Sequence, residues 1–172
     1  MQMETLCTER LILRPTSEAD GAACLDIWLD DEMGRYLADP PRALADERYL
    51  NFAVGIEEDD SWYPMVAIHR ESGVFVGTCS VVPTEDGMCW DLGYCVHRDH
   101  WKKGYGSEMV KRLIEEGRHR GIRAFTAAVA QENAASCALC RKLGFRVWKS
   151  DGSFAKCGTD IVYPEYIWRL EL

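Results

Sequence analysis

The spacing of apolar and polar positions divides this chain into alternating strands and helices. Period-two runs rich in strand-forming residues predict strands over 8–14, 62–69, 74–82, 88–96, 124–130, 146–149 and 160–172. Helical spacing predicts helices that begin at residues 16–20, over 42–56, after Gly106 and from Asn133 to Gly144. The predicted order is strand, two helices, three strands, helix, strand, helix and two strands.

Turn signals indicate how these strands pair. Glu71–Gly73 and Thr84–Gly87 join three consecutive strands by short turns, which favours antiparallel pairing. The strand, helix and strand over 88–130 instead require a parallel crossover. The sequence therefore predicts an α/β protein with a mixed sheet. We expect residues 150–159 to form a loop, Pro164 to interrupt the last strand and Glu57–Asp60 to form a solvated acidic turn.

Composition narrows the class of protein. A length of 172 residues suits one domain with a sizeable core, here taken as residues 1–172. No apolar run of about 18 residues predicts a membrane span, and the polar N-terminus has no signal-peptide core, so we expect a soluble cytoplasmic protein. The net charge of −8 argues against a nucleic-acid partner.

Eight cysteines without an export signal predict reduced thiols and no disulfide framework. The pair Cys137 and Cys140 has the spacing of a redox motif or of half a zinc site. A second pair of Cys or His ligands at a suitable spacing is missing, so we expect no metal. Four others lie among apolar neighbours and are expected in the core: Cys24, Cys79, Cys89 and Cys95.

One stretch, residues 91–110, combines a strand, a glycine-containing turn and the start of a helix. Gly104 and Gly106 permit unusual backbone angles and a close approach to a ligand. The free N–H groups at a helix N-terminus bind anions, most often phosphate, and Lys102 and Lys103 add positive charge. The sequence therefore predicts a phosphate-binding turn.

Four motifs resemble the GNAT N-acetyltransferase superfamily, in particular its Rim-type branch of ribosomal-protein N-terminal acetyltransferases. They are residues 8–14, residues 92–94 with 101–106, Ser107–Glu108, and residues 133–136 with 142–145. One departure is Lys102, which stands where the family often has a glycine. The resemblance implies a single-domain GNAT fold: a mixed, mostly antiparallel twisted sheet of six to seven strands, about four helices and a splayed central strand pair.

The resemblance also implies transfer of an acetyl group from acetyl-CoA to a primary amine, without a metal. The strand before the turn would hold the pantetheine arm as an added strand does, and the turn would hold the pyrophosphate. The cofactor-binding residues are thus expected to be Tyr94, Cys95, Val96, Trp101, Lys102, Lys103, Gly104, Tyr105, Gly106, Ser107 and Asn133. Of these, the side chains of Tyr94 and Tyr105 are expected to pack, and Asn133 also to cap its helix.

Asp91 is the leading candidate for the base that deprotonates the amine. Cys89, Asp91 and Gly93 alternate onto the strand face that would line the acceptor groove. The alternative is an ordinary salt-bridging or solvated strand residue, and Glu165 and His97 are weaker candidates for the base. Ser136 is the candidate acid for the leaving thiolate. The alternative is a serine that only helps to cap its helix.

The acceptor site is expected between the two early helices, the strand from Trp62 and the loop at 150–159. Trp28, Tyr36, Trp62 and Tyr63 either line a groove or, as we favour, mostly pack in the core. Asp30, Asp31 and Glu32 either attract a cation or form a solvated helix end.

Several functions stay open from the sequence. A protein or peptide N-terminal amine is the favoured acceptor, and a small amine (a polyamine, amino acid or antibiotic) is the alternative. A non-catalytic acyl-CoA-binding sensor and a thiol-redox protein are further alternatives. The protein is expected to be either a monomer or a homodimer.

Overall fold

The computed structural model describes residues 3–54 and 61–172. Its eight-stranded sheet has the order β1-β2-β3-β4-β5-β6-β8-β7. The strands are β1 (Leu6–Cys7), β2 (Leu11–Pro15), β3 (Tyr63–His69), β4 (Phe75–Thr84), β5 (Cys89–Val96), β6 (Ala124–Ala130), β7 (Arg146–Ala155) and β8 (Val162–Glu171). The helices are α1 (Gly21–Trp28), α2 (Glu47–Val54), α3 (Tyr105–His119) and α4 (Ala134–Lys142). None of the helices in these two ranges is long and apolar enough to cross a membrane.

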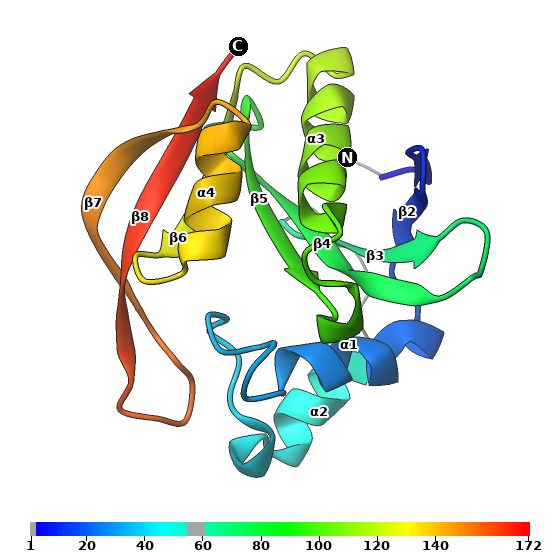
Figure 1. Cartoon of the computed structure of the whole chain (residues 1–172). Coiled ribbons are helices and arrows are strands. Elements are labelled where there is room, and N and C mark those ends of the chain that lie inside the picture. The colour runs from blue at the N-terminus through cyan, green and yellow to red at the C-terminus, as the bar shows by residue number, and fades with distance from the viewer. Residues whose placement is uncertain (1–2, 55–60) are drawn as a thin grey trace.

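Helices cover both faces of the sheet (Figure 1). The larger apolar core contains residues of α3 and α4 together with Trp90 and Phe125 of the sheet. Gly117 of α3 lies so close to the Phe125 ring that an added Cβ would be 2.6 Å from it, so glycine is required for this helix to pack. A smaller cluster around Cys24 and Val66 joins α1 and α2 to the opposite face.

The predicted α/β class and mixed sheet are confirmed, with one more strand than expected. The predicted first strand is two strands, because the chain reverses at residues 8–10. The Thr8 N–H donates to the Leu11 carbonyl oxygen at 2.9 Å, and β1 then pairs with β2.

The prediction of one helix over 42–56 is wrong in part. Residues 42–44 form a separate 3-10 turn, and α2 begins at Glu47. Asp46 explains this start, because its carboxylate accepts the Tyr49 N–H at 2.7 Å as a helix N-cap does. Residues 55 and 56 and the expected acidic turn Glu57–Asp60 lie outside the described residues.

The predicted loop at 150–159 is also wrong in part, because β7 continues to Ala155 and pairs with β8. Two shifts of register, between Val147 and Lys149 and between Lys149 and Gly152, absorb the irregular sequence. Pro164 does not interrupt β8. Its carbonyl oxygen accepts the Gln131 N–H just beyond the last β6 pair. The N–H and carbonyl of one strand residue point to the same side, so the N–H that proline lacks would also point toward β6. Its absence therefore removes no hydrogen bond to β7.

The expected splayed strand pair is confirmed at the centre of the sheet. β5 and β6 are parallel neighbours, but only Cys89–Asp91 pair with Ala124–Thr126. From Leu92 to Val96, β5 has no β6 partner, while β6 continues along β8 to Ala130. The two strands therefore separate and leave a gap at the C-terminal end of β5 (Figure 1).

Candidate active site

The turn that follows β5 has the backbone geometry of an anion site. Gly104 is the N-cap of α3 and has a left-handed backbone with φ of 82°. No described residue accepts a hydrogen bond from the N–H groups of residues 102–107. They lie at the positive end of a 15-residue helix, so the turn can bind an anion such as a phosphate.

A polar cluster holds this turn against β2. The Glu108 carboxylate accepts hydrogen bonds from the Thr8 hydroxyl at 2.6 Å, the Arg10 N–H at 3.0 Å and the Arg10 Nε at 2.8 Å. Burial raises the pKa of Glu108, but the hydrogen bonds from Thr8 and Arg10 outweigh it and leave the pKa below its usual value. Arg10 also donates to the Lys103 carbonyl oxygen at 3.0 Å.

These positioning roles of Thr8, Arg10 and Glu108 were not predicted. All three residues lie in motifs of the family resemblance, but no function was expected for them.

The gap between β5 and β6 starts directly beside the turn. The Trp101 indole N–H donates to the Val96 carbonyl oxygen at 2.6 Å and so ties the end of β5 to the turn. The unpaired edge from Leu92 to Val96 can accept an extended, amide-containing ligand as an added strand. The turn and this edge together fit a long molecule with phosphates at one end.

Asp91 lies at the point where β5 and β6 separate. The Thr126 hydroxyl donates to its carboxylate at 2.6 Å, and no described residue forms an ion pair with it. Burial raises the pKa of Asp91 above its usual value, and the Thr126 hydrogen bond opposes that shift. Burial also raises the pKa of Glu165, as does the negative charge of Asp91. Two carboxyl groups thus lie on one side of the gap, and each favours a proton more than it would in water.

The strand alternation that the sequence predicted around Asp91 is confirmed. An added Cβ on its near neighbour Gly93 would meet Ser80, and the Cys95 thiol donates to the Met33 carbonyl oxygen on the α1 side of the sheet. Tyr94 points to the other side, where its ring approaches Gly106 at the start of α3. Asp91 therefore faces the side opposite α3.

Ser136 and Tyr94 form a hydroxyl pair on the α3 and α4 side of the gap. Their oxygen atoms share a hydrogen bond of 2.9 Å, and burial raises the pKa of Tyr94 to about 12. Asn133 caps α4 by accepting the Ser136 N–H at 3.2 Å, as the sequence predicted. Ser136 is thus part of the cap and also part of a protonated hydroxyl pair. The Tyr94 side chain was expected to pack, and its hydrogen bond to Ser136 was not predicted.

Comparisons with known proteins agree with this geometry. A family model described as an acetyltransferase (GNAT) domain matches residues 10–146. The chain belongs to the GNAT acetyltransferase domain family. It is 30% identical over 152 residues to an uncharacterized N-acetyltransferase, p20, of Bacillus licheniformis, covering 84% of this chain and 83% of p20.

Two further similarities differ in the acceptors that their names state. Over 89 residues, 49% of this chain and 52% of the relative, the GNAT domain is 36% identical to an L-methionine sulfoximine/L-methionine sulfone acetyltransferase of Salmonella typhimurium. The fold matches the RimL ribosomal L7/L12 α-N-protein acetyltransferase in complex with coenzyme A, with a TM-score of 0.77 and 18% identity over 98% of both chains.

The turn of this GNAT domain explains why Lys102 is unusual. Lys102 has φ of 60°, in the left-handed region that favours glycine. A lysine there costs about 1 kcal/mol relative to a glycine.

The aromatic residues expected near the acceptor site mostly pack, as we favoured. Tyr63 is buried in the core. The Trp28 indole donates to the Thr78 hydroxyl at 3.1 Å and lies 6.4 Å from the Trp62 ring. Tyr36 is only partly buried and belongs to neither core cluster, but its ring packs edge-on against Tyr163 of β8, with 5.5 Å between ring centres.

Two weaker candidates have structural partners. Arg98 binds the carboxylates of Asp30 and Glu32, so these two acids are neither free to attract a ligand cation nor a merely solvated helix end. His97 caps the 3-10 turn at residues 98–100, where its Nδ1 accepts the Asp99 N–H at 3.3 Å.

The thiols of Cys137 and Cys140 are both buried. Burial raises the pKa of both, that of Cys140 to about 12. A protonated, buried thiol is a poor nucleophile and a poor metal ligand. Cys24, Cys79, Cys89 and Cys95 are buried, as predicted.

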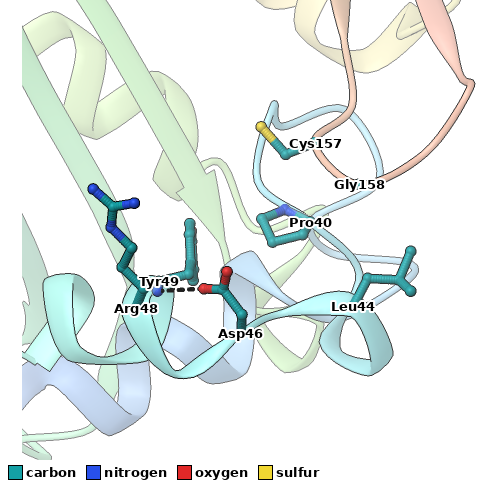
Figure 2. A pocket seen from close by; sticks show the side chains of 7 residues that line it. All are labelled: Pro40, Leu44, Asp46, Arg48, Tyr49, Cys157 and Gly158. Carbon is teal, nitrogen blue, oxygen red and sulfur yellow. Dashed lines mark hydrogen bonds between the residues drawn. The ribbon is translucent and has the colours of Figure 1, made fainter.

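A hollow of about 440 Å³ lies away from the gap, where α2 meets the turn between β7 and β8 (Figure 2). Its lining comes mostly from two of the segments expected to form the acceptor site, residues 42–56 and 150–159, but it contains none of the candidate catalytic or cofactor-binding residues. It comprises Pro40, Leu44, Asp46, Arg48, Tyr49, Cys157 and Gly158. The Tyr49 hydroxyl donates to the Asp39 carboxylate, and burial raises the pKa of Tyr49.

Proposed function

We propose that this protein, as a single domain over residues 1–172, is an N-acetyltransferase that moves the acetyl group of acetyl-CoA to a primary amine. The observation that carries the proposal is the joint between the turn at 102–107 and the gap between β5 and β6. The turn offers free N–H groups, and the gap offers an unpaired strand edge that ends at Asp91. This sequence of features suits a ligand with a phosphate end, an amide-containing chain and a reactive group close to Asp91.

The residues fit acetyl-CoA in two parts. The N–H groups of residues 102–107 bind the pyrophosphate, with Lys102 and Lys103 nearby. The Leu92–Val96 edge binds the pantetheine amides, and Asn133 lies at the start of the helix on the far side of the gap. Bound acetyl-CoA supplies an activated thioester. The complex of the RimL neighbour with coenzyme A supports this assignment.

Different side chains at the gap carry out the two proton transfers of the reaction. Asp91 accepts a proton from the acceptor ammonium, directly or through water, which frees the amine lone pair. The C–N bond forms as the C–S bond breaks, and a β5 N–H stabilises the negative charge that develops on the carbonyl oxygen. The hydroxyl pair of Ser136 and Tyr94 donates a proton to the leaving thiolate. Orientation of two bound reactants supplies much of the acceleration.

Two classes of acceptor have support. The resemblance to the Rim-type branch and the RimL neighbour favour a protein N-terminal amine. The relative named for L-methionine sulfoximine and L-methionine sulfone favours an amino-acid-like amine. Both share the reaction at Asp91 and differ only in what surrounds the amine.

A CoA-release assay tests the proposal. Purified protein and acetyl-CoA are incubated with a panel of amino acids, polyamines and N-terminal peptides, and the products are weighed by mass spectrometry. We expect CoA release together with a gain of one acetyl group on at least one amine. Tight binding of acetyl-CoA without transfer to any amine would contradict the proposal and support a non-catalytic acyl-CoA sensor.

A further inference from the structure

Residues 30–39, which we call the strap, connect α1 to the turn before α2 and contact both sides of the gap. Figure 1 shows this blue segment between α1 and α2, near the open end of the gap. Internal hydrogen bonds shape it, since the Gly34 N–H donates to Asp30 O at 2.8 Å and the Leu37 N–H to Gly34 O at 3.0 Å. The strap is thus a built segment with fixed turns.

One end of the strap is held to the β5 side. Arg98, just after β5, binds the carboxylates of Asp30 and Glu32. The Cys95 thiol of β5 donates to the Met33 carbonyl oxygen at 3.5 Å. These contacts fix residues 30–33 beside the β5 edge.

The other end is held to the β7–β8 hairpin by Lys156. This side chain is only 5% exposed, and its ammonium donates to the carbonyl oxygens of Gly34 at 2.9 Å, Leu37 at 3.1 Å and Asp39 at 2.8 Å. An ammonium has three N–H donors, so every donor is used. Charged hydrogen bonds shielded from water are stronger than exposed ones, and they make this a firm attachment.

Further contacts seat the hairpin tip on the strap. The Cys157 N–H donates to Ala38 O at 2.9 Å, and the Tyr163 ring packs on Tyr36. Figure 2 shows Cys157 and Gly158 beside Pro40, at the end of the strap. Arg35 also pairs with Glu132, which follows β6, at 3.4 Å. The strap therefore links β5, the end of β6 and the β7–β8 hairpin.

This link covers the side of the sheet that Asp91 faces. Asp91 lies on the α1 side, as does the Cys95 thiol that contacts the strap. A polypeptide acceptor would need an open groove there for the residues that follow its terminal amine. The strap and the hairpin tip lie against each other on the side of β5 that Asp91 and Cys95 share.

We propose that the strap, locked by Lys156, encloses the acceptor side of the gap and restricts the acceptor to compact primary amines of amino-acid size. This inference rests on the proposed acetyltransferase function. Lys156 is a positioning residue, because it acts through the strap carbonyls.

The test compares wild type with Lys156→Met, which keeps an unbranched side chain one atom shorter and removes the three donors. Lys149→Met, on exposed Lys149 of β7, is the matched control. Kinetics are measured with free amino acids, a diamine and N-terminal hexapeptides. We expect wild type to prefer compact amines at least 100-fold in kcat/KM. Lys156→Met is expected to raise KM for the compact amine about tenfold with a smaller change in kcat. The ratio of kcat/KM between compact amines and peptides should therefore fall. The Kd for acetyl-CoA should be the same in Lys156→Met as in wild type. The control variant should have the kinetics of wild type.

Hydrogen exchange gives a readout that does not depend on activity. The Gly34 and Leu37 amides are expected to exchange slowly in wild type and at least tenfold faster in Lys156→Met. Arg98→Gln, an exposed change that releases the β5 end, gives the same test if Lys156→Met does not fold. Fast exchange in wild type would overturn the locked strap even if no amine is acetylated. Efficient acetylation of peptides by wild type would overturn the acceptor restriction while the acetyltransferase function stands.

Discussion

At the scale of single residues, the strongest test concerns Asp91. Asp91→Asn keeps the size of the side chain but removes the base, so we expect kcat to fall about 100-fold while the Kd for acetyl-CoA stays within twofold. Because burial raises the pKa of Asp91, the wild-type rate should rise with pH through that pKa, and the variant should lose this rise. Initial rates from pH 5 to 9 measure both effects. Equal rates for variant and wild type across this range would remove Asp91 from the role.

The same substitution has a consequence for stability. A carboxyl whose folded-state pKa is raised stabilises the fold below its unfolded-state pKa and loses that contribution as the pH rises through the folded-state value. Asp91→Asn should therefore stabilise the protein at pH 7 and should have little effect at pH 4. Urea unfolding at the two pH values measures this. A loss of stability at pH 7 would mean that the carboxylate is a structural partner.

Ser136 and Tyr94 are expected to matter less, because a thiolate is a good leaving group near neutral pH. Ser136→Ala should lower kcat about threefold, and Tyr94→Phe by a similar factor, since each removes one hydroxyl of the pair. The double variant should cost little more than either change alone, because the hydroxyls act together. Stopped-flow measurement of CoA release would show this. An unchanged rate with every accepted amine would leave Ser136 with only its capping role.

At the scale of elements, β2 and α3 hold the phosphate turn between them. Glu108→Gln removes the charge that binds Arg10, so we expect a loss of about 1–2 kcal/mol in stability and an increase of about tenfold in the Kd for acetyl-CoA, because Arg10 no longer fixes Lys103. Chemical denaturation and calorimetric titration measure the two. Glu115→Gln, an exposed acid on the same helix, is the control. Unchanged affinity would show that the turn keeps its shape without the cluster.

Elements with one dominant local signal were predictable. The apolar stripe and Gly117 of α3, and the run of small residues in β6, determine their structures locally, and β6 has the predicted bounds. β7 was misjudged after Lys149, because its residues are mostly polar and exposed and its strand state comes from pairing with β8. The split between residues 42–44 and α2 depends on one Asp46 hydrogen bond, which spacing alone does not show.

At the scale of the whole molecule, contacts between distant segments were the part that the sequence could not reveal. The face of Asp91 followed from strand alternation, and the phosphate turn followed from its glycines. The three hydrogen bonds of the Lys156 ammonium join residues 117 to 122 positions apart. Their acceptors are backbone carbonyls, which every residue has, so the sequence does not reveal them. A lysine in a polar hairpin is usually solvated, so its burial was unexpected.

The gap divides the sheet into two parts, β1–β5 and β6–β8, whose strands pair directly at only three positions. A ligand that fills the gap should fasten these parts together. Acetyl-CoA at about 100 times its Kd is expected to raise the melting temperature by roughly 5 °C. Acetylpantetheine at the same concentration lacks the phosphates that the turn binds, so its shift should be about 1 °C. Calorimetry with both ligands measures the difference. Equal shifts would show that the turn at 102–107 contributes little to binding, and the anchor of the proposed function would then have to lie elsewhere.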